Sequence, residues 1–150
     1  MKILIAMPSR SAKDPMLLQA LEYLDHSRPP FRSTALFLNT KQEEDPNKRK
    51  ELEAQSLLKS TEGFYRVALA EDGRRMNSLD FTNHVAKLVS SQKVAFIIGG
   101  AFGLSPELIK ECQSSLSMSS MTLPHRLAFL LLSEQIFRAS EIWQNTSYHK

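Results

Sequence analysis

The sequence has a single cysteine and no long apolar run. One cysteine among 150 residues, Cys112, excludes an internal disulfide and agrees with a reducing compartment. No segment approaches the run of about 18 apolar residues that a membrane span requires. The first residues, Met1, Lys2 and Ile3, lead into a strand-like run and not into a signal peptide. We therefore expect a cytoplasmic protein that does not contact a membrane.

A strong charge of one sign is also absent. The net charge is +3 and the isoelectric point is about 9.1, which permits binding to a polyanion but is less basic than most dedicated nucleic-acid domains. Apolar residues make up 42% of the chain and charged residues 23%, as in soluble globular proteins. This length suits a single domain over residues 1–150 with its own core.

Short apolar runs alternate with amphipathic stretches along the chain. The predicted strands cover residues 2–7, 31–38, 64–69, 94–98 and 114–118. Five helices are predicted: one that starts at the cap Asp14, one over residues 51–60, one from the cap Ser78 to residue 91, one that starts at the cap Ser105, and one over residues 126–143. Residues 41–50 are charged and lack apolar side chains, so we predict a solvated loop there, and residues 70–74 are predicted as a turn. This alternation is typical of an α/β protein with a mostly parallel sheet.

The stretch over residues 94–125 is the most informative part of the chain. An unbroken apolar strand ends at Gly99 and Gly100, and two glycines at such a place allow a ligand to lie against the main chain. Ser105 then caps a helix that has Pro106 and Glu107 in its first turn. A loop over residues 119–124 follows the next strand. The two loops form one pocket if their strands are neighbours.

Two alternatives remain open from the local pattern. Residues 99–103 read GGAFG, which lacks the G-x-G-x-x-G spacing of a dinucleotide site, and a turn that only reverses the chain is as consistent with it as a ligand site. The loop after the first strand, Pro8-Ser9-Arg10-Ser11, is the only support for a phosphate-binding, flavodoxin-like domain.

The last predicted helix is apolar almost all round in its first half, where residues 127–132 read LAFLLL. A helix with one side in water should be amphipathic, so this segment needs a second covering surface. Self-association supplies such a surface, and we expect a homodimer. The alternative is a helix buried deeply within one domain, which so small a core rarely provides.

Four segments resemble the RlmH family of SPOUT methyltransferases. They are FIIGGAFGLS at 96–105, SMS with MTLPH at 117–125, EQIFRA at 134–139 and YHK at 148–150. The resemblance is dense from residue 96 onward and thinner before it, while length and element order agree over the whole chain. It implies an α/β fold with a deep C-terminal trefoil knot, one of the rare exceptions to unknotted topology, in a homodimer.

The resemblance also implies a cofactor and a reaction. RlmH enzymes use S-adenosylmethionine, without a metal, to methylate N3 of a pseudouridine in 23S ribosomal RNA, and we expect the assembled large subunit or the whole ribosome as substrate. The residues expected at the cofactor are Leu69, Gly99, Gly100, Gly103, Met118, Ser119, Ser120, Met121, Thr122 and Leu123. The family usually has an aspartate where this chain has Ala70, although Glu71 and Asp72 follow. The sulfonium of the cofactor is positively charged, so we expect its site to lack lysine and arginine. Among the residues near the expected site, only Arg74 is an exception.

The catalytic candidates by resemblance are His149, Tyr148, Arg138 and His125. The enzyme must align the base nitrogen with the methyl group and assist loss of the N3 proton. We expect the tail to reach the site of the partner subunit, with His149 as base or orienting group. A disordered terminal histidine and, for His125, a residue that only starts a helix are the structural alternatives.

The chain contains no separate RNA-binding domain, so we expect recognition of a folded RNA surface. The expected phosphate contacts are Arg74, Arg75, Arg126, Arg138 and Lys150. A non-catalytic nucleotide- or ribosome-binding module is the alternative function. It explains the glycine turn and the mild basicity, but it gives no reason for the tail motif.

Overall fold

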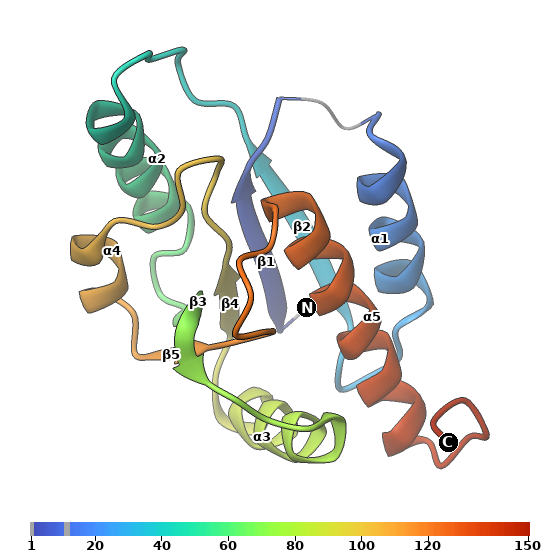
Figure 1. Cartoon of the computed structure of the whole chain (residues 1–150). Coiled ribbons are helices and arrows are strands. Elements are labelled where there is room, and N and C mark those ends of the chain that lie inside the picture. Colours follow the sequence, from blue (N-terminus) through green and yellow to red (C-terminus); the bar gives the residue numbers. More distant parts are fainter. Residues whose placement is uncertain (1, 11–12) are drawn as a thin grey trace.

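A five-stranded parallel sheet forms the centre of the computed structural model, which describes residues 2–10 and 13–150 (Figure 1). The strands are β1 (Ile3–Pro8), β2 (Ser33–Leu38), β3 (Tyr65–Arg74), β4 (Val94–Ile97) and β5 (Ser114–Leu116). Their order is β2-β1-β4-β3-β5, and each neighbouring pair is parallel. The predicted α/β class with a parallel sheet is confirmed. Ser11 of the predicted phosphate loop lies outside the described residues.

Helices cover both faces of the sheet (Figure 1). They are α1 (Pro15–His26), α2 (Pro46–Ser60), α3 (Ser78–Ser91), α4 (Pro106–Lys110) and α5 (His125–Trp143). The larger core cluster joins one face of the sheet to α1, α3 and α5, and the smaller cluster joins the other face to α2 and α4. Among the helices formed by the described residues, none has both the length and the apolar character needed to cross a bilayer.

The alternation of side chains along β1 shows why the central strands read as continuous apolar runs. Ile3, Ile5 and Met7 belong to the larger cluster, while Ala6 packs in the smaller cluster with Leu57 of α2. Successive strand residues point to opposite faces, and both faces of β1 are covered. The same holds for β4, whose four residues are all buried.

Helix α2 begins five residues earlier than predicted. The Asp45 side chain accepts hydrogen bonds from the backbone N–H groups of Asn47 at 2.8 Å and Lys48 at 3.2 Å, and Pro46 occupies the first helical position. The predicted solvated loop over residues 41–50 is therefore wrong for residues 46–50. An aspartate cap followed by proline is a start signal that outweighs the lack of apolar residues.

Strand β3 continues through the segment predicted as a turn. Leu69 and Arg74 both pair with Leu116 of β5, so the register shifts between them at a bulge. Ser117 N–H donates to the Arg74 carbonyl at 3.0 Å, which continues the pairing. The prediction of a simple turn over residues 70–74 is wrong because β5 supplies a partner that local sequence does not reveal.

The start of α3 also differs by one residue from the prediction. Asn77, not Ser78, is the cap, since the Asn77 side chain accepts from the Asp80 N–H at 2.8 Å. Ser78 is the first helical residue and its hydroxyl donates to Gln135 of α5 at 2.6 Å. Both residue types cap helices well, so sequence preference alone did not distinguish them.

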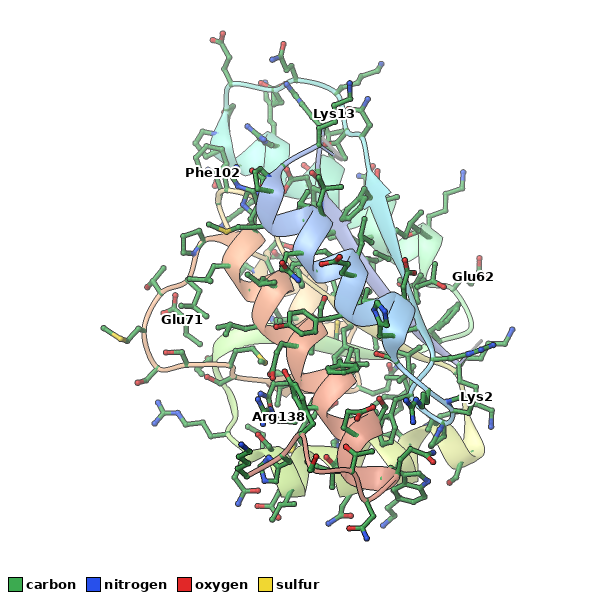
Figure 2. The ribbon with its side chains drawn as sticks, turned by 90° about the vertical axis from the view of Figure 1, so that its right-hand side faces the viewer. Lys2, Lys13, Glu62, Glu71, Phe102 and Arg138 are labelled. Carbon is green, nitrogen blue, oxygen red and sulfur yellow. The ribbon has the colours of Figure 1, made fainter. Side chains whose placement is uncertain are left out.

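Helix α5 lies beside α1 on the outer surface of the protein (Figure 2). Its inner side chains, Phe129, Leu132 and Ile136, are fully buried, but Leu131 is 36% exposed. Leu18 of α1 and Trp143 at the end of α5 are each 52% exposed. The alternative of a deeply buried last helix is wrong, and an apolar surface on α1 and α5 stays uncovered in the single chain.

Candidate functional site

A cavity of about 1020 Å³ lies where β3, β4 and β5 end. We call it the central cavity. Segments 69–72, 98–104 and 118–125 line it, Ser120 excepted, together with Ile109 and Ala128. Because β3 pairs with both β4 and β5, the bulged part of β3 meets the loops that follow β4 and β5 at this edge of the sheet.

The central cavity gathers most of the residues predicted at a cofactor. Those that line it are Leu69, Gly99, Gly100, Gly103, Met118, Ser119, Met121, Thr122 and Leu123. Ser120 is exposed and is not part of the lining. Ala70, Glu71 and Asp72 also line the cavity, so the departure at Ala70 leaves two carboxylates in the same segment.

The glycine turn at residues 99–103 presents bare backbone to the central cavity. Gly103 N–H donates to the Gly100 carbonyl at 3.0 Å, and Gly103 has a φ of +77°, in the region that favours glycine. A Cβ on Gly99 would lie 2.5 Å from the carbonyl carbon of Gly103. The turn can close this tightly only without side chains at these positions.

The loop before α5 is shaped by its serines. Met121 N–H donates to the Ser119 hydroxyl at 2.9 Å, and the Ser117 hydroxyl donates to the Ser119 carbonyl at 2.8 Å. Hydroxyl groups that bond nearby backbone favour such compact turns over regular structure. The Met121 side chain is 74% exposed at the tip of this loop, so it is available to contact a ligand or a second chain.

The central cavity is acidic. Its lining includes Glu71 and Asp72 but no lysine or arginine among the described residues. Arg74, the expected exception, lines a separate cavity of about 360 Å³ with His84. Carboxylates without opposing cations favour a positively charged ligand.

His125, the first residue of α5, lines the central cavity in a half-buried position. Burial lowers the pKa of His125 below 6.5, and the neighbouring Arg126 lowers it further. The imidazole is therefore neutral at physiological pH and has one ring nitrogen that can accept a hydrogen bond or a proton.

We expect the free energy of unfolding to fall as the pH is lowered from about 7.5 to about 5.5. Burial lowers the pKa of His84 as well as that of His125, so the unfolded chain takes up protons in this range that the folded chain does not. Urea unfolding at several pH values measures the effect. The double variant His84→Gln, His125→Gln should lose most of this slope, and a wild-type stability that rises toward low pH would contradict the assignment.

Three of the catalytic candidates gather around Glu134, at the middle of α5. Glu134 Oε1 accepts from Arg138 Nε at 2.9 Å and from the Tyr148 hydroxyl at 3.0 Å. The Arg138 guanidinium lies 4.8 Å from the centre of the Tyr148 ring, which also packs on Phe137 at 4.9 Å. Arg138 Nη1 is 3.3 Å from His149 Nδ1. We call Glu134, Arg138, Tyr148 and His149 the tail cluster.

The tail cluster determines which protons its members carry. A guanidinium only donates, so His149 Nδ1 accepts from Arg138 and a neutral ring carries its proton on Nε2. Burial and the hydrogen bond to Glu134 raise the pKa of Tyr148 to about 12. The hydrogen bond with Glu134 also raises the pKa of Arg138. The cluster therefore presents the Arg138 cation, which is paired with Glu134, and the His149 Nε2–H as a donor, while the Tyr148 hydroxyl donates to Glu134.

The tail cluster does not reach the central cavity of its own chain. None of its members lines that cavity, and the 13 residues from His125 to Arg138 rise by about 20 Å along α5. Figure 2 shows Arg138 far from Phe102 of the glycine turn, and in Figure 1 the C-terminus lies beside the opposite end of α5. Of the four catalytic candidates, the structure brings only His125 to the cavity.

The expected phosphate contacts do not form one patch. Arg126 pairs with Asp14, the cap of α1, and lines a second cavity. Arg74 lines the cavity beside His84, Arg138 belongs to the tail cluster, and Arg75 and Lys150 are exposed. These side chains therefore lie in different surroundings in the described chain.

Sequence reasoning missed Glu53, a buried carboxylate under the glycine turn. Glu53 is 3% exposed, and its Oε1 lies 3.2 Å from Arg49 Nε. A Cβ on Gly100 would lie 2.7 Å from both carboxylate oxygens, and Arg49 lies 5.5 Å from the Phe102 ring centre. One signal was present: Glu53 precedes the buried Leu57 by four residues, on the inner face of α2.

Comparison with known proteins gives a consistent result. The family model described as "Predicted SPOUT methyltransferase" matches residues 1–149. Over 84 residues the chain is 50% identical to ribosomal RNA large subunit methyltransferase H of Prochlorococcus marinus strain MIT 9313, which covers 56% of this chain and 58% of that relative. The chain thus matches little more than half the length of this relative.

Longer and more distant matches extend the similarity. Ribosomal RNA large subunit methyltransferase H of Bacillus cereus strain ATCC 10987 is 37% identical over 135 residues, covering 89% of this chain and 80% of the relative. A crystal structure of a probable methyltransferase from Bordetella pertussis superposes with a TM-score of 0.60 at 11% identity, over 92% of this chain and 95% of that one, which shows a shared fold. The chain belongs to the SPOUT methyltransferase family, with relatives named ribosomal RNA large subunit methyltransferase H.

Proposed function

We propose that this protein is an S-adenosylmethionine-dependent methyltransferase that methylates N3 of a pseudouridine in 23S ribosomal RNA. The central cavity carries the proposal. It joins three segments of the chain, it contains carboxylates without opposing cations in its lining, and it coincides with segments that resemble the RlmH family. The names of the relatives, which refer to large-subunit ribosomal RNA, support the substrate class.

The residues present fit the methyl donor. Leu69, Met118 and Leu123 supply apolar walls suited to adenine, and the backbone of residues 99–103 supplies hydrogen-bonding groups. Glu71 and Asp72 favour the positive charge of the sulfonium. When bound, the donor supplies an electrophilic methyl group. The cavity residues bind and orient it, and the apolar walls exclude water.

A trefoil knot and a homodimer belong to the same proposal. The knot is what the resemblance to the RlmH family implies. The exposed Leu18, Leu131 and Trp143 give α1 and α5 a surface for a second copy. In the proposed dimer, the tail cluster of one chain acts at the central cavity of the partner.

In the proposed mechanism the tail cluster acts on the target base. The Arg138 cation stabilises the negative charge that develops as the imide loses its N3 proton. His149 Nε2–H is a donor that can orient a carbonyl oxygen of the ring, and the Tyr148 hydroxyl, which donates to Glu134, holds the cluster in place. The hydrogen bond from Arg138 to His149 Nδ1 favours an orienting role for His149 over that of a base. Neutral His125 in the cavity is then the proton acceptor.

We further propose that the protein acts in the cytoplasm as one domain, on the assembled large subunit or the whole ribosome. The expected phosphate contacts lie at separate places on the described chain: Arg126 lines a cavity, whereas Arg75 and Lys150 are exposed. A folded RNA surface that presents its phosphates at fixed positions can use separate cations. Methylation of free 23S RNA as fast as that of ribosomes would contradict this substrate.

Two measurements test the function. Calorimetry should detect S-adenosylmethionine binding in about the micromolar range. Mass spectrometry of 23S RNA from cells that lack the gene should show loss of one methyl group from a single modified uridine, restored by the wild-type gene. Donor binding without any change in RNA would contradict the RNA substrate, and absence of donor binding would favour the non-catalytic binding module.

A further inference from the structure

A second cavity adjoins the central cavity at the carboxyl ends of β1 and β2. It has a volume of about 400 Å³ and shares Gly100, Ala101 and His125 with the central cavity. We call it the basic cavity, because its lining carries four cationic side chains, Arg10, Lys13, Arg49 and Arg126, against two carboxylates, Asp14 and Glu53. Apart from the three shared residues, the proposed reaction assigns no role to the residues of the basic cavity.

Two features of the basic cavity favour an anion. Its side chains have an excess of two positive charges, since burial keeps His125 neutral through its lowered pKa. Helix α5 begins at His125 without a side-chain cap, so its first N–H groups are not satisfied by a side chain, and the first two residues of this 19-residue helix line the cavity. Uncapped helix N-termini attract phosphate groups.

Arg10 is the cation best placed for a new ligand. Arg126 already pairs with Asp14, and Arg49 pairs with Glu53. Arg10 is exposed and forms no ion pair within the described part of the chain. It follows β1 in the Pro8-Ser9-Arg10 segment, whose sequence suggested a phosphate loop. A phosphate can therefore bind Arg10 without breaking an existing pair.

Glu53 indicates that the ligand of the basic cavity also carries a hydrogen-bond donor. Its Oε2 is buried and has no hydrogen-bond partner among the described residues, although Glu53 lines the cavity. A buried carboxylate oxygen is stabilised by a donor. Inorganic phosphate in its ionised form offers acceptors for the cations but little for this oxygen. A ribonucleotide offers both groups, because its 2′-hydroxyl can donate while its phosphate accepts.

We propose that the basic cavity binds the ribonucleotide next to the methylated one in the RNA strand, with its phosphate at Arg10 and its 2′-hydroxyl donating to Glu53. This rests on the proposed function and adds to it a means of holding the strand. Because the two cavities share Gly100 and Ala101, a nucleotide held in one places the adjoining base beside the other. Glu53 also makes the site selective for RNA over DNA.

Binding of uridine 5′-monophosphate, followed by NMR, tests the site without any methyl transfer. We expect shift changes at Arg10 and Gly100, and weaker binding of the 2′-deoxy nucleotide by about three- to tenfold. Arg10→Ala should weaken uridine 5′-monophosphate binding by a similar factor, and Glu53→Gln should reduce the preference for the ribonucleotide. Lys59→Ala, at the opposite end of α2 from Arg49, is the matched control. Unchanged binding in Arg10→Ala or shifts confined to other surfaces would overturn the proposal.

Kinetics with ribosomes separate an RNA site from a site for free nucleotides. Arg10→Ala should raise the KM for ribosomes by about three- to tenfold and reduce the salt dependence of log KM by about one, with the affinity for S-adenosylmethionine retained. Nucleotide binding with an unchanged KM would assign the cavity to free nucleotides and overturn the RNA proposal. If wild-type protein methylates no RNA, the proposed function fails while the NMR result still decides whether the cavity binds a ribonucleotide.

Discussion

Gly99→Val is expected to weaken S-adenosylmethionine binding by about 100-fold or more, the equivalent of about 3 kcal/mol. A Cβ at this position would lie 2.5 Å from the Gly103 carbonyl carbon and 2.8 Å from Leu104 N. Both are backbone atoms, so the side chain cannot be accommodated unless the whole turn moves. Since the turn is a wall of the central cavity, the donor loses its backbone contacts. Isothermal titration calorimetry measures the change.

Gly63→Ala is the matched control for this prediction. Gly63 has a φ of +79°, and a Cβ there has nothing within 4 Å, so alanine costs about 1 kcal/mol through backbone strain alone. Both variants should lose stability in urea unfolding, but only Gly99→Val should lose donor affinity. If Gly99→Val binds the donor as tightly as Gly63→Ala, the central cavity is not the donor site.

Deletion of residues 148–150 is expected to lower kcat by about 100-fold or more with donor affinity nearly unchanged. The deletion removes Tyr148 and His149, which do not line the central cavity of their own chain, so the site for S-adenosylmethionine stays intact. It removes the His149 donor to the target base and the Tyr148 hydroxyl that holds Glu134. Calorimetry and methyl-transfer rates on ribosomes separate the two effects. Ser147→Ala, an exposed position in the same tail, should retain wild-type activity.

Mixing two inactive variants tests whether the tail acts across the dimer. A chain lacking residues 148–150 keeps a functional cavity, and a Gly99→Val chain keeps a functional tail. When equal amounts of the two chains are unfolded and refolded together, about half of the dimers contain one chain of each kind. Each mixed dimer has one complete site out of two, so the mixture should recover about a quarter of wild-type activity. No recovery despite mixed dimers on native mass spectrometry would mean that the tail acts within its own chain.

The order of helices and strands was predictable because each has a local signal. Continuous apolar runs predicted the buried strands β1 and β4, and proline after an aspartate or serine predicted the starts of α1 and α4. The same signal at Asp45 and Pro46 was passed over because the following residues are charged. The extension of β3 to Arg74 depends on pairing with Leu116, which no local pattern contains.

The parts of the candidate site that are formed by backbone were predictable from the sequence. The parts that are formed by side chains were less predictable. The resemblance directed attention to the loops that line the central cavity, since glycine turns and serine loops are readable in sequence. Glu53 was missed because a glutamate on a charged helix is ordinarily solvated. Its burial follows from the position of Gly100 above it, a contact between residues 47 positions apart.

By itself, the sequence determined the parallel α/β class and the positions of the glycine and serine loops, because these depend on local preferences. The motifs of the sequence, including its tail, also suggested the family to which the chain belongs. Only the tertiary structure decided that β3 lies between β4 and β5, that β3 and two loops line an acidic cavity, and that a basic cavity adjoins it. It also separated the tail cluster from the central cavity. Strand order and helix packing bring together residues far apart in the chain, and their chemistry arises from that proximity.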